Sequence, residues 1–112
     1  MSLSLTLVIE RPSRAPQTIP ARNTLDYGYV TDELHALMLP VSVPLPEGIE
    51  YADDEEGRKL QHEDQYGAPL SYVPAALLVP RLREHARSPW ELAIVTFIEK
   101  LPPSTRVVLW WH

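Results

Sequence analysis

Cysteine is absent from all 112 residues of the chain, which excludes a disulfide framework, a thiolate nucleophile and a cysteine-ligated zinc site. No apolar run approaches the roughly 20 residues that a membrane-spanning helix requires. The opening stretch MSLSLTLVIER has neither the basic start nor the small-residue cleavage site of a signal peptide. From these absences we expect a soluble, cytoplasmic protein with no membrane partner.

Glycine is scarce, with four residues, and neither a glycine-rich phosphate-binding loop nor a GxSxG nucleophile motif occurs. The four histidines form no HExxH motif and no pair at the four-residue spacing of helical zinc sites. Counted from Asp53, Arg58 stands where a calcium loop requires glycine, and Asp64 stands where it requires glutamate. We therefore expect no cofactor, no metal and no catalytic residue, and an enzyme is not the favoured class.

Basic clusters are also missing. The net charge is −5, and the negative charge is concentrated between Glu47 and Asp64, where eight acids and two bases give −6. Because sequence-independent nucleic-acid binding depends on Lys and Arg that neutralise phosphates, we expect no direct contact with DNA or RNA. We predict instead that residues 47–64 form an exposed acidic segment that presents charge to a basic protein partner. The overlapping polar stretch 53–69 is expected to be solvated.

Alternating apolar and polar residues predict strands at both ends of the chain, near residues 3–10 and 105–111. In the second of these strands, Leu109 and Trp111 share a face that we expect to join the core. Trp110 lies on the opposite face. Two interpretations of Trp110 stay open: it packs against the sheet, or it belongs to a surface that binds a partner.

The middle of the chain is less regular. Prolines 44 and 46 restrict VSVPLPEGIEY to an edge strand or a loop, in which Gly48 permits a turn. The stretches GIEYA and PLSYV are each typical of a short strand.

The best-specified helix covers residues 89–101. Ser88 and Glu91 have the spacing of a capping box, and Pro89 occupies the first helical position, where a missing amide costs least. The apolar stripe that we expect to be buried consists of Trp90, Ile94, Phe97, Ile98 and Leu101.

Two further helices are expected, near residues 31–39 and 75–87. Thr31 is the candidate N-cap of the first, and Pro40 ends it. Pro80 interrupts the second, so the pattern leaves open whether that segment is one kinked helix or two short pieces.

The pattern as a whole predicts a small α+β fold, with a mostly antiparallel sheet and two to three helices packed on it. No repeat occurs, and the sequence on either side of the acidic segment is too short for a good core of its own. Residues 1–112 should therefore form a single domain.

The order of several pieces resembles a set of short bacterial and phage-borne proteins of unassigned function. The pieces are YGYVTDELHALM, PLPEG, an acidic stretch, DQYGAPLSYVPAALL and LPPSTRVVLWWH, which together span residues 27–112. The chain departs from that pattern at PLPEG, where a basic Arg-Gly-Leu-Pro turn is usual, and at Tyr72, where tryptophan is usual. The resemblance implies a protein of a mobile element and carries over no catalytic residue.

The favoured function is a non-catalytic protein–protein interaction module. In a phage or mobile element, such a module would inhibit or modulate a host system. Acidic residues would set the association rate with a basic protein partner, and aromatic residues would supply affinity. The candidate partner-binding residues are Tyr51, Asp53, Asp54, Glu55, Glu56 and Trp110.

Two alternatives belong to other classes. One is a self-associating assembly subunit, such as a homodimer that uses an apolar sheet face. The other is a small enzyme in which carboxylates converge with His62 or His35 in a cleft.

Overall fold

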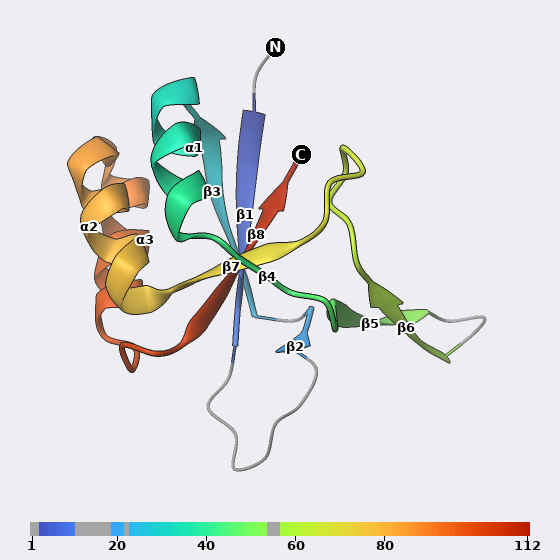
Figure 1. Ribbon diagram of the computed structural model, residues 1–112. Coiled ribbons are helices and arrows are strands. Elements are labelled where there is room, and N and C mark those ends of the chain that lie inside the picture. The colour runs from blue at the N-terminus through green and yellow to red at the C-terminus, as the bar shows by residue number, and fades with distance from the viewer. Residues whose placement is uncertain (1–2, 11–18, 22, 54–56) are drawn as a thin grey trace.

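The computed structural model describes residues 3–10, 19–21, 23–53 and 57–112. These residues form a five-stranded sheet, a three-stranded sheet and three α-helices (Figure 1). The helices are α1 (Asp32–Met38), α2 (Ala75–His85) and α3 (Pro89–Glu99), and a 3-10 turn, η1 (Leu39–Val41), follows α1. The predicted α+β class with a mostly antiparallel sheet is confirmed.

The larger sheet has the strand order β3-β1-β8-β7-β4, and every neighbouring pair in it is antiparallel. Its strands are β1 (Leu3–Ile9), β3 (Thr24–Val30), β4 (Val43–Pro44), β7 (Ser71–Pro74) and β8 (Arg106–Trp111). The smaller sheet has the order β2-β5-β6, with strands β2 (Ile19–Pro20), β5 (Ile49–Asp53) and β6 (Gly57–Gln61). β5 and β6 form a hairpin, and β2 runs parallel to β5.

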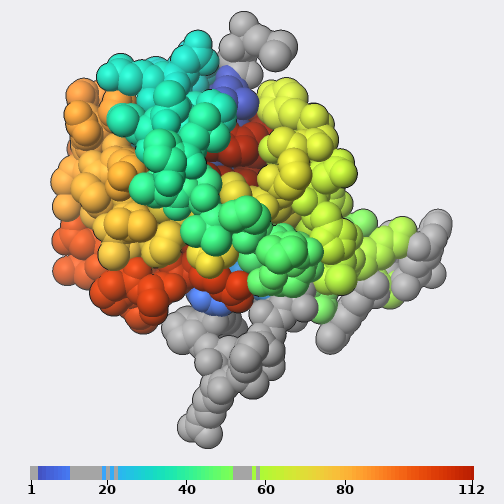
Figure 2. Space-filling view, in the orientation of Figure 1, coloured from blue at the N-terminus to red at the C-terminus, as the bar shows by residue number. Residues whose placement is uncertain are grey.

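Strand β8 is the centre of the larger sheet, between β1 and β7. The helices lie together on one side of this sheet, and the β5–β6 hairpin lies on the other (Figure 1). In the space-filling view, the red end of the chain lies at the bottom of a recess between α1 and the segment after β6 (Figure 2). A strand covered on both faces needs apolar side chains on both, which explains the nearly continuous apolar run of β8.

Two hydrophobic cores form on the two faces of β8. Val107, Leu109 and Trp111 are buried in the core beneath the helices, as predicted for the face that carries Leu109 and Trp111. Val108 belongs to a second core on the opposite face, and Trp110 packs against this core while remaining partly exposed. The second core consists of Val8, Ile19, Leu45, Ile49, Leu70 and Val108.

Helix α3 begins as its sequence predicts, with both hydrogen bonds of the Ser88–Glu91 capping box present. The predicted buried stripe is wrong at two positions, since Trp90 is 58% exposed and Phe97 is 49% exposed. The helix covers β3 and the neighbouring α2, so that only the flank with Ile94, Val95 and Ile98 is buried. Trp90 instead donates a hydrogen bond from its indole nitrogen to the Asp26 carbonyl on β3, at 2.6 Å.

Pro80 lies inside one continuous helix, which decides between the two interpretations of this segment. A proline at this position removes the amide that would bond to the Ala76 carbonyl. Because Ala76 and Pro80 are both exposed, water can satisfy that carbonyl, and the helix continues to His85. In α1, Thr31 caps the helix as predicted, accepting a hydrogen bond from the Leu34 amide at 3.2 Å.

The described residues 57–69 of the polar stretch are more ordered than the sequence predicts. They contain β6, and Asp64 is only 7% exposed. The Asp64 carboxylate accepts hydrogen bonds from the Tyr66 and Ala68 amides, at 2.8 and 3.1 Å. The expectation of a wholly solvated segment is therefore wrong at these residues, because a buried carboxylate builds the turn that returns the chain to β7.

An ion cluster at the start of β8 links the two sides of the molecule. The Arg106 guanidinium binds Glu10 at 2.6 and 2.7 Å and Glu47 at 2.7 Å, and it lies over the Tyr72 ring. The hydrogen bond to Glu10 is the largest cause that raises the pKa of Arg106 above its ordinary value. The pKa of Glu47 is lowered, first by a backbone hydrogen bond from its own amide and then by Arg106.

Replacing Arg106 should weaken the fold. Arg106→Met keeps the aliphatic stem but leaves Glu10 and Glu47 without their cation, and we expect the free energy of unfolding to fall by about 2 kcal/mol. Urea unfolding at neutral pH measures the loss. Arg83→Met is the matched control, because its partner Glu99 is on an exposed surface and the loss should be much smaller. Equal losses in the two variants would contradict the role of the cluster.

Tyr27 should make the protein sensitive to alkali. Its side chain is 3% exposed, and its hydroxyl has no hydrogen-bond partner among the described residues. Burial, reinforced by the charge of Glu91, raises its pKa to about 12. The folded state therefore holds this proton more tightly than the unfolded chain, in which the pKa is about 10. The contribution of Tyr27 to the free energy of unfolding is therefore fully present below the unfolded-state pKa. It is lost as the pH rises through the folded-state pKa.

We expect Tyr27→Phe to abolish this loss, which reaches about 3 kcal/mol at most. At neutral pH the variant should be about 1 kcal/mol more stable, because it removes a buried hydroxyl without a partner. Unfolding by urea at a series of alkaline pH values measures both effects, with the exposed Tyr66→Phe as control. If the natural protein and Tyr27→Phe lose stability in parallel above pH ~10, the assignment to Tyr27 is wrong.

Candidate functional site

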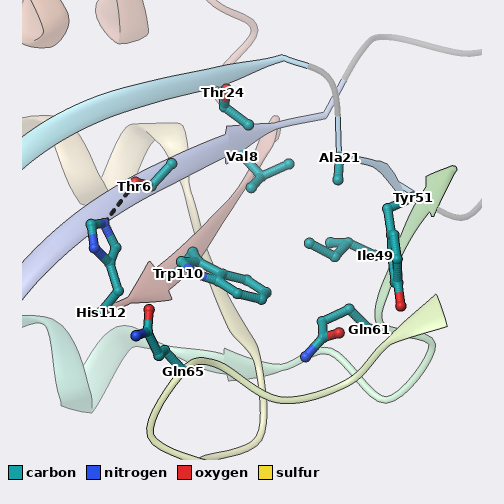
Figure 3. Close-up of a pocket in the computed structure, with 10 residues that line it drawn as sticks. All are labelled: Thr6, Val8, Ala21, Thr24, Ile49, Tyr51, Gln61, Gln65, Trp110 and His112. Carbon is teal, nitrogen blue, oxygen red and sulfur yellow. Dashed lines mark hydrogen bonds between the residues drawn. The ribbon is translucent and has the colours of Figure 1, made fainter. Parts of the chain in front are cut away.

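A pocket of about 600 Å³ opens between the two sheets (Figure 3). One wall is the face of the larger sheet that points away from the helices. β1 contributes Thr6 and Val8 to this wall, and Trp110 and His112 come from β8 and the residue after it. The pairing of Thr6 with Trp110 and of Val8 with Val108 places alternate residues of neighbouring strands on this one face.

The hairpin forms the opposite wall, with Ile49 and Tyr51 from β5 and Gln61 from β6. Ile49 pairs with Gln61 across the hairpin. The turn before β5 requires Gly48, which has a φ of +69° and approaches so closely that an added Cβ would lie 2.4 Å from the Gln61 carbonyl oxygen. This close approach fixes Gln61 beside the start of β5. The remaining lining residues are Ala21, Thr24 and Gln65.

The indole of Trp110 lies in the middle of the pocket, between His112 and the hairpin residues Ile49 and Tyr51 (Figure 3). One part of this side chain packs on the second core, and the rest is accessible. Val8 and Ile49 extend the apolar floor on the side of that core. The pocket therefore offers a fixed aromatic surface whose position is set by buried neighbours.

Hydrogen-bonding side chains surround this aromatic surface. The Thr6 hydroxyl and the His112 Nε2 atom are joined by a hydrogen bond of 2.9 Å. Gln61 donates from its amide nitrogen to the Glu63 carbonyl at 2.8 Å, which leaves its side-chain oxygen available as an acceptor. Of the ten described residues that line the pocket, none has a carboxylate, ammonium or guanidinium side chain. The site thus combines a mainly apolar surface with a few hydrogen-bonding side chains.

The structure brings together two of the six residues predicted to bind a partner, Tyr51 and Trp110. Asp53 is described by its backbone, which pairs with Gly57 at the end of the hairpin. Asp54, Glu55 and Glu56 lie outside the described residues, so the predicted acidic surface stays a prediction. Two acids of the acidic segment have structural contacts instead: Glu47 binds Arg106, and Asp64 is buried in its turn.

The histidines considered for catalysis lie on different faces of the larger sheet. His35 is on α1, with its ring edge against Trp111 at a centroid distance of 4.7 Å. His62 follows β6, and its Nδ1 atom is 3.2 Å from the Pro46 carbonyl oxygen. Neither residue lines the pocket described above.

Sequence reasoning missed Thr6, Gln61, Gln65 and His112 as pocket residues. The alternation of β1 and β8 does place Thr6, Trp110 and His112 on faces opposite the core. This alternation does not give the strand register that places Thr6 beside Trp110. It also does not show that the hairpin faces them.

Within the described ranges, no helix is long and apolar enough to cross a membrane. The same residues contain no group of three or more histidine, aspartate or glutamate side chains arranged to hold a metal ion.

Comparisons of the chain with protein-family models, with curated proteins and with solved structures find no match in any of the three. The resemblance to short bacterial and phage-borne proteins therefore stays a prediction.

Proposed function

We propose that this protein is a non-catalytic binding module whose ligand enters the pocket between the two sheets and is uncharged where it contacts the pocket. The observation that carries the proposal is the composition of the lining: an aromatic side chain in the centre, hydrogen-bonding groups around it, and no carboxylate, ammonium or guanidinium side chain among the ten described residues. Sites of this kind, mainly apolar with a few placed polar groups, are typical of small-molecule and anchor-group recognition.

Burial costs also favour an uncharged ligand. A charged group transferred from water into this pocket would lose hydration without finding an opposite charge on a lining side chain. A neutral polar group can exchange its hydrogen bonds to water for bonds to hydroxyl and carboxamide groups at little net cost. The aromatic surface of Trp110 then supplies the favourable apolar contact.

The hydrogen bond between Thr6 and His112 is consistent with binding rather than chemistry. Activation of a hydroxyl nucleophile by histidine normally requires a third group that orients the imidazole. The described lining residues provide no carboxylate for that purpose. In our proposal the pair fixes the rim of the pocket and offers hydrogen-bonding groups to the ligand.

The predicted acidic surface is kept as a separate part of the proposal. Asp53 ends β5 two residues after Tyr51, so the acids predicted to bind a partner follow a pocket residue closely in the sequence. Their role would be to guide a basic partner, since charge chiefly affects the association rate.

A screen of small fragments by nuclear magnetic resonance tests the proposal. Isotope-labelled protein is exposed to matched sets of neutral, anionic and cationic fragments. We expect neutral fragments to shift the amide signals of Thr6, Gln61 and Trp110 more often than charged ones. Shifts that are centred elsewhere, or that arise equally from all three sets, would count against the proposal.

Three variants sharpen this test. Trp110→Phe retains an aromatic ring in the second core but reduces the stacking surface, and it should weaken fragment binding about tenfold. Trp90→Phe, at the exposed face of α3, makes the same substitution away from the pocket and should leave binding unchanged. Changing Asp53, Asp54, Glu55 and Glu56 together to Asn or Gln should also leave the affinity for neutral fragments unchanged, because in our proposal these acids act on the association with a basic partner.

A further inference from the structure

We infer that the ligand of this pocket is a neutral carbohydrate, with one pyranose ring stacked on the indole of Trp110. This inference rests on the proposed function and specifies its ligand class. Trp110 presents a flat apolar surface in the middle of the pocket (Figure 3). A pyranose has a flat face of C–H groups whose weakly positive hydrogens suit the negative face of an aromatic ring.

The hydrogen-bonding groups around the indole are of the kind that suits sugar hydroxyls. Each sugar hydroxyl is both a donor and an acceptor, so its best partners are groups that also do both. Threonine and tyrosine hydroxyls and glutamine carboxamides have this property, and they recur in the lining as Thr6, Thr24, Tyr51, Gln61 and Gln65. Lining groups from both sheets therefore surround the ring that would stack on Trp110.

The position of the apolar residues agrees with this ligand. Val8 and Ile49 lie toward the buried second core, and the hydroxyl–imidazole pair of Thr6 and His112 lies at the other end of the wall (Figure 3). A sugar ring has the same division, with apolar faces and a polar circumference. A purely apolar ligand would leave the surrounding hydroxyl and carboxamide groups without partners, which is unfavourable for groups that lose water on binding.

Charge separates this ligand from the main competing class. A nucleotide would also stack on tryptophan, but its phosphates require cations or clustered backbone amides. No lysine or arginine side chain is among the described residues that line the pocket. The same argument disfavours sugar phosphates and uronic acids. A volume of about 600 Å³ is within the usual range for small-ligand sites and leaves room for a mono- or disaccharide.

The test is a titration of the isotope-labelled full chain with neutral sugars: glucose, galactose, mannose, N-acetylglucosamine, and the disaccharides cellobiose and maltose. Glucose 6-phosphate, glucuronic acid and adenosine are the comparison ligands. We expect at least one neutral sugar to shift the Trp110 indole signal with a dissociation constant of about 1 mM or tighter. The charged analogue of the same sugar should bind at least about tenfold more weakly.

Substitutions separate a sugar contact from a general loss of folding. Tyr51→Phe removes only the pocket hydroxyl and should weaken the sugar several-fold, whereas Tyr66→Phe removes an exposed hydroxyl outside the pocket and should change nothing. Gln65→Ala should also weaken the sugar, and its amide spectrum should otherwise match that of the natural protein. Equal sugar affinity in Tyr51→Phe, Gln65→Ala and the natural protein would overturn the inference.

The outcomes distinguish this inference from the proposed function. If neutral fragments bind at the pocket but no sugar in the panel does, the carbohydrate inference is wrong and the binding module stands. Preference for adenosine over every sugar would likewise overturn the inference and point to a planar heterocycle. If neither fragments nor sugars shift the pocket signals, both proposals fail.

Discussion

The structure depends on the pairing of β8 between β1 and β7. This strand provides side chains to both hydrophobic cores, with Leu109 and Trp111 beneath the helices and Val108 facing the smaller sheet. Neither layer is independent of the other, because each packs on the same backbone from opposite sides. A change in the register of β8 by one residue would exchange its two faces and disrupt both cores at once. The nearly continuous apolar sequence of β8 follows from this double burial.

The location of the pocket follows from how far the smaller sheet extends over β8. Along the face opposite the helices, Val108 is fully buried, whereas Trp110 and His112 are both partly exposed. The hairpin covers the first of these residues and leaves the last accessible. Arg106 strengthens the covered end by joining Glu10 after β1 to Glu47 before β5. On this face, β8 is therefore covered by the smaller sheet at its Arg106 end and open at its His112 end.

Local sequence signals predicted the helices that have capping residues and the strands that have regular apolar alternation. The capping box at Ser88 and the N-cap at Thr31 mark α3 and α1 correctly, and alternation marks β1 and β8. Strand β3 gave no such signal. Leu5 pairs with Gly28 and Thr6 with Asp26, which makes Tyr27 an extra residue that breaks the alternation. β6, with the sequence GRKLQ, forms only because β5 pairs with it.

The candidate site was predictable only in part, for a related reason. Aromatic character was enough to single out Tyr51 and Trp110, but their proximity depends on how one sheet is placed over the other. The exposure of Trp90 and Phe97 has the same origin, because the helical period identifies an apolar flank without specifying how much of it a neighbour covers. The proximity of the pocket residues and the exposure of the helix residues both depend on tertiary packing, which no local sequence pattern encodes.

The contact between β1 and β8 also has a kinetic consequence. Thr6 and His112, which share a hydrogen bond, are separated by 106 positions in the chain. Contacts of such long range require an entropically costly loop to close before they gain any stabilising interaction, and proteins rich in them fold slowly. During synthesis, the edge of β1 that pairs with β8 stays without its partner until a strand made about a hundred residues later is available. Until then the helices have an incomplete sheet to pack on, because β8 is the central strand of that sheet.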